Sequence, residues 1–124
     1  MSEQEESTPK RKTLLLIAVR DGIESSVCDM DRICKMGKDD AMNTIIGNIN
    51  LMIEMSAHFD GAFNSCKVKT ANKKGVKSLV VSYDNFGKET SFSIPYSEGD
   101  GSSYPENVVN GMLSAINIII DGGA

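Results

Sequence analysis

The sequence predicts an α+β domain in which a small antiparallel sheet of about three strands is packed by two N-terminal helices and one C-terminal helix. Two observations carry this prediction. Apolar residues recur at helical spacing before residue 57 and after residue 105. Between residues 64 and 96, apolar and polar residues alternate instead, and turn signals separate the alternating stretches. The order helix, helix, strands, helix is typical of helices that cover one face of a sheet.

The N-terminal residues differ in composition from the rest of the chain. Residues 1–12 combine three glutamates, a proline and a basic trio, and they offer no apolar cluster that could join a core. The sequence therefore predicts a disordered tail over residues 1–12, followed by a single domain over residues 13–124. The length of 124 residues suits one domain of ordinary size.

The first helix is predicted from two adjoining segments. An apolar run at residues 14–19 is too short for periodicity to distinguish a buried strand from the first turns of a helix. Downstream, apolar residues recur at helical spacing, namely Ile23, Val27, Met30 and Cys34. They predict a helix over about residues 22–36, which Gly37 ends and which can extend back through the apolar run.

The segment from Lys38 to Ala57 is the clearest helix in the sequence. Asp39 or Asp40 can cap its N-terminus, where acidic charge also suits the helix dipole. The large apolar residues gather on one face of this helix, and they are Met42, Ile45, Ile46, Ile49, Met52 and Ile53. That face is expected to point into the core.

The sheet and the last helix follow. Residues 66–70, 78–83 and 90–96 predict strands, and Asp84-Asn85-Phe86-Gly87 is the strongest turn signal between them. Pro95 has no backbone N–H to donate, so the last strand is expected at an edge of the sheet. After a Gly/Ser loop, Pro105 suits the first turn of a final helix that extends to about Ile120.

Two of the predicted helices lack the charged outer face of an ordinary surface helix. No charged residue occurs from Ala41 to Ile53 or from Asn107 to Ile120. Interface cores are depleted in charged residues, so these helices predict a homo-oligomer seam or a partner-docking face. The candidate interface residues are Met42, Ile46, Asn50, Ile53, Asn110, Leu113, Asn117 and Ile118. The alternative is that both helices are wedged between other elements of the same domain.

The sequence contains no specific motif for catalysis, a cofactor or a metal. The chain has three cysteines and one histidine, His58. Cys28 and Cys34 are six residues apart, which is too far for a tight ligand pair or for one helical face. We therefore expect no catalytic residue, no metal and no cofactor. An odd number of cysteines suits free thiols in a reducing compartment, which predicts a cytoplasmic location.

Lysines accompany the first predicted strand and its turn, and they suggest a second kind of site. In this alternative the chain binds a nucleotide or another anion, with charge and hydrogen bonds supplied by Lys67, Lys69, Lys73, Lys77, Ser102 and Ser103. Lysines on an edge strand also protect against aggregation, which is the simpler interpretation.

Charge and hydropathy narrow the possible partners. A net charge of −4 disfavours a dedicated nucleic-acid-binding protein. No stretch approaches the roughly 20 apolar residues that span a bilayer. The sequence therefore favours a non-enzymatic inhibitor, adaptor or regulator of a protein partner that forms a homo-oligomer, with a dimer favoured.

Overall fold

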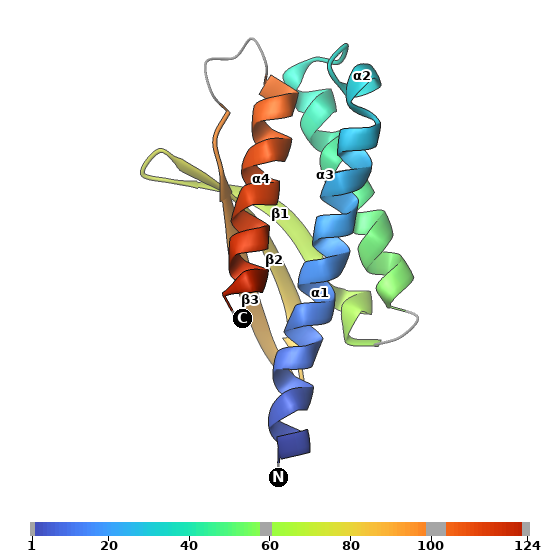
Figure 1. The fold of residues 1–124 in the computed structure, drawn as a ribbon, viewed down its shortest axis with the longest axis vertical. Coiled ribbons are helices and arrows are strands. Elements are labelled where there is room, and N and C mark those ends of the chain that lie inside the picture. Colours follow the sequence, from blue (N-terminus) through green and yellow to red (C-terminus); the bar gives the residue numbers. More distant parts are fainter. Residues whose placement is uncertain (1, 58–60, 99–103, 123–124) are drawn as a thin grey trace.

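A computed structural model describes residues 2–57, 61–98 and 104–122 of the chain. Its elements, in chain order, are α1 (Ser2–Cys28), α2 (Met30–Ile33), α3 (Lys38–Ser56), the 3-10 helix η1 (Gly61–Ser65), β1 (Lys67–Lys73), β2 (Val76–Asn85), β3 (Lys88–Tyr96) and α4 (Tyr104–Asp121). The strands form one antiparallel sheet in the order β1-β2-β3. Figure 1 shows the helices on one face of this sheet, so the predicted α+β architecture is confirmed.

Helix α1 is longer than the sequence predicted. It includes residues 14–19, so the apolar run is helical and does not form a strand. The helix also continues back to Ser2, through the segment predicted to be a disordered tail. From Arg11 onward, the first buried residue of α1 is Leu15, whereas Arg11 contacts the β2–β3 turn, with its guanidinium carbon 4.0 Å from the Phe86 ring centroid. The domain boundary after residue 12 therefore stays a prediction.

The single helix predicted over residues 22–36 was wrong, because the structure divides this segment between α1 and the four-residue α2. Asp29 lies between them with φ −103° and ψ 14°, which departs from helical geometry. Its carboxylate accepts hydrogen bonds from the Arg32 guanidinium. The Asp29 N–H still donates to the Ser25 and Ser26 carbonyl oxygens, and the Asp29 carbonyl accepts from the Ile33 N–H, so the backbone stays close to helical through this break and apolar periodicity does not reveal it.

Helix α3 agrees with the predicted element to within one residue, but its N-terminus differs from the prediction. Gly37 occupies the cap position, and no side chain caps the helix there. Asp39 and Asp40 lie in the first turn instead, where their charge still favours the helix dipole. The predicted capping role was wrong because the chain becomes helical at Lys38, one residue before Asp39.

Two tight turns connect the three strands. Positive φ angles occur at both turn residues of each hairpin, namely Lys74 and Gly75 in the first and Phe86 and Gly87 in the second. This pattern is typical of type I′ turns, which match the twist of the flanking strands. The side chains of Asn72 and Asp84 accept hydrogen bonds from the backbone N–H groups of Gly75 and Gly87, at 3.1 and 3.3 Å.

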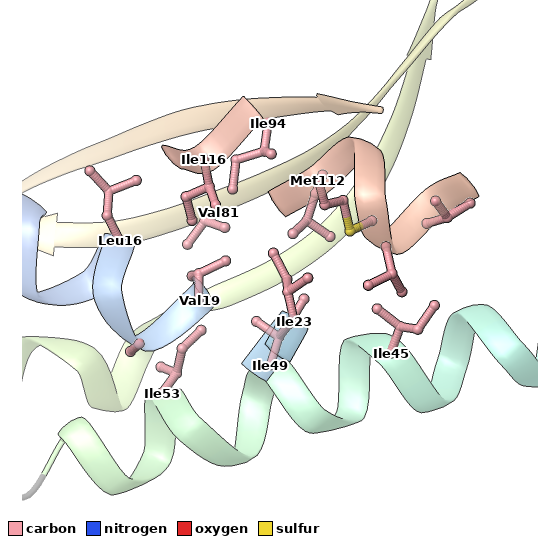
Figure 2. Close-up of a cluster of buried hydrophobic side chains, with 14 of the residues drawn as sticks. Leu16, Val19, Ile23, Ile45, Ile49, Ile53, Val81, Ile94, Met112 and Ile116 are labelled. Carbon is pink, nitrogen blue, oxygen red and sulfur yellow. The ribbon is translucent and has the colours of Figure 1, made fainter. Parts of the chain in front are cut away.

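The core lies between the sheet and the helices (Figure 2). Leu79 and Val81 of β2 pair with Ile94 and Phe92 of β3, so their side chains share the helix-facing side of the sheet. Helix α1 crosses α3 and packs against both α3 and α4, and the starts of α3 and α4 also meet (Figure 1). Its side chains meet the other elements in a cluster that includes Leu16, Val19, Ile23, Ile45, Ile49, Ile53, Met112 and Ile116.

Candidate functional site

The outer side of α3 combines uncharged polar residues with exposed apolar residues. We call this surface the outer α3 face, and its members are Asn43, Gly47, Asn50, Leu51 and Met55. Leu51 is 53% exposed and Met55 is 54% exposed. A 100° turn per residue places Asn43, Gly47, Asn50 and Leu51 opposite the buried face of α3, with Met55 at the side. Two large apolar side chains therefore remain half in water on a face that is uncharged around Gly47 and is flanked by the exposed acidic residues Asp40 and Glu54.

Gly47 lies in the middle of the outer α3 face, and packing within the chain does not account for it. A β-carbon added at Gly47 would have no described heavy atom within 4 Å. The other interior helical glycines differ: a β-carbon would be 2.4 Å from the Ile49 α-carbon at Gly22, and 3.3 Å from the Ser97 nitrogen at Gly111. Glycine inside a helix is about 0.8–1.0 kcal/mol less favourable than alanine. At Gly22 and Gly111 the glycine permits close packing, which offsets this cost. At Gly47 no close packing within the described part of the chain offsets it.

A second uncharged surface lies on α4. This outer α4 face consists of Asn110, Ser114 and Ile118, all of which are exposed, and Ile118 is 72% exposed. Asn117 adjoins the face but has a partner within the chain, because its Oδ1 accepts a hydrogen bond from Arg20 of α1 at 3.2 Å. Asn117 therefore helps to join α4 to α1.

The two uncharged faces are separate surfaces. Helix α1 packs against both α3 and α4, and it carries Asp21 and Glu24 among its exposed residues. Charged side chains of this kind favour water over an interface core. The outer α3 face and the outer α4 face are therefore two different surfaces for a binding partner.

The structure divides the predicted interface residues into two groups. The exposed group is Asn50, Asn110 and Ile118. The members of the other group either pack in or against the core or form a hydrogen bond within the chain. They are Met42, Ile46, Ile53, Leu113 and Asn117. Ile53, at 3% exposure, belongs to the core of the domain. Sequence reasoning missed Leu51 and Met55, although the same helical periodicity that assigned the buried face of α3 would have placed both on the outside.

The lysines of the predicted anion site do not come together. Lys67, Lys69 and Lys73 pair with the residues of β2 that alternate with its buried ones, so these three face away from the helices. Lys77 lies on the other face, and its Nζ is 2.9 Å from Glu98 Oε2. Ser102 and Ser103 lie outside the described residues.

A cavity of about 410 Å³ lies where the start of α3, the sheet and the start of α4 meet, and its lining includes Lys77, Tyr96, Glu98 and Tyr104. The pKa of Tyr104 is raised to about 12, chiefly by burial and in addition by the nearby Glu98 and Tyr96. Burial also raises the pKa of Tyr96, with Glu98 as the next cause. Surroundings that disfavour a phenolate also disfavour a bound anion.

The thiol of Cys66 is not activated. Burial raises the pKa of Cys66 to about 11, so its thiol stays protonated and weakly nucleophilic at neutral pH. Cys28 and Cys34 are free and exposed. Among the described residues, no three His, Cys, Asp or Glu side chains gather in a way that could hold a metal ion. His58 lies outside the described residues.

Comparison with known proteins identifies no relative: no family model, curated protein or solved structure matches the chain. Within the described ranges, no helix has both the length and the apolar content needed to cross a membrane. The function is therefore inferred from the surfaces of the domain.

Proposed function

We propose that this protein is a non-enzymatic adaptor or regulator that binds a protein partner and acts as a homo-oligomer, with a dimer favoured. The observation that supports this proposal is the exposure of large apolar side chains on two uncharged helical faces. Leu51 and Met55 project from α3, and Ile118 projects from α4. Full burial of one such side chain is worth about 1.5–3 kcal/mol, so covering these half-exposed groups favours association.

The presence of two faces suits an adaptor better than a simple dimer. The acidic residues of α1 separate the outer α3 face from the outer α4 face, so occupation of one leaves the other accessible. One face then serves self-association and the other serves a protein partner. Interfaces of both kinds are depleted in charge at their centres.

The anion-binding alternative has less support. Three of its lysines lie on one face of the sheet, and the fourth, Lys77, is paired with Glu98 on the other. A nucleotide panel in a thermal unfolding assay tests this alternative, because a ligand that binds only the folded state must raise its stability. We expect no shift of the unfolding temperature.

We further propose a reducing compartment, such as the cytoplasm, as the location. The three cysteines are all free, and two of them are exposed. Exposed thiols persist as thiols where glutathione and thioredoxin keep them reduced.

Native mass spectrometry and light scattering on the purified full chain test the proposed function. The wild type should be an oligomer, and one of the two variants Asn50→Arg and Asn110→Arg should weaken it, namely the variant that places a charge on the face used for self-association. Ser91→Arg is the matched control, because it adds the same charge at an exposed position of β3, far from both faces in sequence and on the sheet. A wild type that stays monomeric at high concentration contradicts the homo-oligomer.

A further inference from the structure

We propose that the free edge of β1 binds an extended segment of a protein partner in which acidic residues alternate with apolar ones, and that this segment pairs with β1 as an additional strand of the sheet. The inference goes beyond the proposed function, because it adds a third surface to the two uncharged helical faces. It also holds for a monomer, so its tests do not depend on the oligomeric state.

The first argument is the hydrogen bonding of β1. The strand order β1-β2-β3 places β1 at an edge, where it pairs with β2 only. Lys73 and Val76 flank a two-residue turn, so they exchange backbone hydrogen bonds with each other, and the bonded positions of β1 alternate from there. The N–H and C=O groups of Val68, Thr70 and Asn72 therefore point away from β2. Within the described ranges, no other backbone group bonds to them.

The second argument is the charge beside this edge. Lys67, Lys69 and Lys73 project from β1 on the face of the sheet turned away from the helices, and all three are exposed. The residues of β2 opposite them are uncharged, and none of the three forms an ion pair with a described acidic side chain. Asp84 and Glu89 lie on the same face, but past the start of β1, beside the β2–β3 turn. The row of lysines therefore complements a strand that carries carboxylates.

The third argument is that the backbone groups and the charges are in register. A partner strand would bond to Thr70 and its alternate neighbours, which leaves Lys69 and the other two lysines at the positions between the bonds. At such positions the α-carbons of facing residues in antiparallel strands are only about 4.5 Å apart. An acidic residue opposite each lysine would therefore be at close range, where opposite charges stabilise the pairing of two strands.

The helix-facing side of the edge has room for the alternate side chains of such a segment. The cavity of about 410 Å³ is lined by Met42 of α3 and by Thr70 and Asn72 of β1. A second cavity, of about 620 Å³, lies just before the start of β1, and its lining includes Ile53 of α3 and Cys66. Residues of an added strand that do not face the lysines would turn toward α3, so apolar side chains suit these positions.

The same features argue against other occupants. Two β1 strands from two copies of the chain would bring lysines together, and like charges on facing residues destabilise strand pairing. Single-stranded nucleic acid is held by basic grooves that also carry aromatic side chains for base stacking. The uncharged residues on the outward face of the three strands are all non-aromatic, and they are Ala71, Val76, Ser78, Val80, Ser82, Ser91, Ser93 and Pro95. An acidic peptide segment also satisfies the free backbone groups of β1, which a nucleic acid does not.

The first test is an NMR titration of the isotope-labelled full chain with a synthetic peptide that alternates glutamate and valine, begins and ends with glutamate, and has the seven-residue length of β1. We expect the amides of Val68, Thr70 and Asn72 to shift and to become protected from hydrogen exchange. A peptide of the same composition with its glutamates and valines in separate blocks should bind about tenfold more weakly. Equal binding of both peptides, or no binding of the alternating one, overturns the inference. Binding of a thymidine oligonucleotide and of neither peptide overturns it and indicates a nucleic-acid surface.

The second test uses the register. The central valine of the alternating peptide would face Thr70 and donate its N–H to β1, whereas the N–H of the next glutamate would point to solvent. Methylation of the backbone nitrogen of that valine should therefore abolish binding, and methylation at the glutamate should leave the dissociation constant unchanged. Equal effects of the two methyl groups would show that the peptide is held by charge alone, which overturns the strand pairing.

The third test changes the chain. Lys69→Glu should raise the dissociation constant of the alternating peptide by about tenfold, because it turns an attraction across the strand pair into a repulsion. Lys88→Glu is the matched control, since it makes the same change of charge at an exposed position of β3, on the opposite edge of the sheet, and it should leave the constant unchanged. Equal losses in the two variants would overturn the placement of the peptide on β1. Circular dichroism confirms that each variant is folded.

Discussion

Gly22 of α1 lies directly against the backbone of α3 at Ile49. A β-carbon at position 22 would be 2.4 Å from the Ile49 α-carbon and 2.9 Å from the Asn48 carbonyl oxygen. Beside this contact, the Asn48 amide donates a hydrogen bond to Ser26 Oγ at 3.0 Å, and Ser26 Oγ donates to the Gly22 carbonyl oxygen at 3.4 Å. These contacts set the register between the two helices, and with it the positions of α3 that remain outside.

Replacement of Gly22 by alanine should lower the free energy of unfolding by about 2–3 kcal/mol, because α1 and α3 must move apart to admit the methyl group. Urea unfolding followed by circular dichroism measures the loss. Gly47→Ala is the matched control, and under dilute conditions that favour the monomer it should raise stability by up to about 1 kcal/mol. Equal stability of Gly22→Ala and wild type would contradict the close approach of α1 and α3.

Replacement of Asn117 by alanine should lower the free energy of unfolding by about 0.5–1.5 kcal/mol. The change removes the acceptor for Arg20 at the α1–α4 contact. Asn110→Ala, on the exposed side of the same helix, should change stability by less than about 0.5 kcal/mol. Thermal unfolding of the two variants in parallel distinguishes the structural asparagine from the surface one, and similar losses for both would count against the assigned bond.

Replacement of Arg11 by alanine should loosen the β2–β3 turn. The guanidinium lies over the Phe86 ring, and its Nη1 is 3.5 Å from the Asp84 carbonyl oxygen. An exposed cation–π contact is worth about 0.5–1 kcal/mol. Hydrogen exchange should therefore become faster in residues 84–87 of Arg11→Ala and stay unchanged in Lys12→Ala. Unchanged protection in Arg11→Ala would show that the N-terminal part of α1 does not hold this turn.

The stability of the domain should fall as the pH rises from about 10 to 12. The folded-state pKa of Tyr104 is raised to about 12, chiefly by burial, whereas an unfolded tyrosine titrates near 10. Above pH 10 the unfolded chain therefore loses the Tyr104 proton before the folded chain does, which favours unfolding. The loss from this residue should be of the order of 1–2 kcal/mol by pH 12.

Urea unfolding at a series of pH values measures this decline. In Tyr104→Phe the ionisable hydroxyl is absent, so the decline should be smaller by the share that Tyr104 contributes. A parallel decline in the variant and the wild type would show that Tyr104 titrates normally in the folded chain.

Local patterns predicted most of the secondary structure. The second helix, the three strands and the last helix were all found close to their predicted places, because apolar periodicity and turn chemistry act over a few residues. The end of α1 at Cys28 was missed because the Asp29 turn and its bond to Arg32 leave no periodic signal. Lys67, Lys69 and Lys73 do share one face, because alternate residues of a strand point the same way, whereas Lys77 lies on the other face of the sheet, in β2.

The sequence by itself determined most of the elements from Lys38 onward and which of their faces turn inward, since both depend on the order of apolar and polar residues along the chain. Only the tertiary structure decided which of the helical glycines packs against a neighbouring backbone and which lies open. Gly22, Gly47 and Gly111 are alike in the sequence, each a glycine inside a helix with a large apolar residue directly beside it. Two of them lie against neighbouring backbone and the third lies open, because the register of α1 on α3 and of α4 on β3 is set by packing between distant segments.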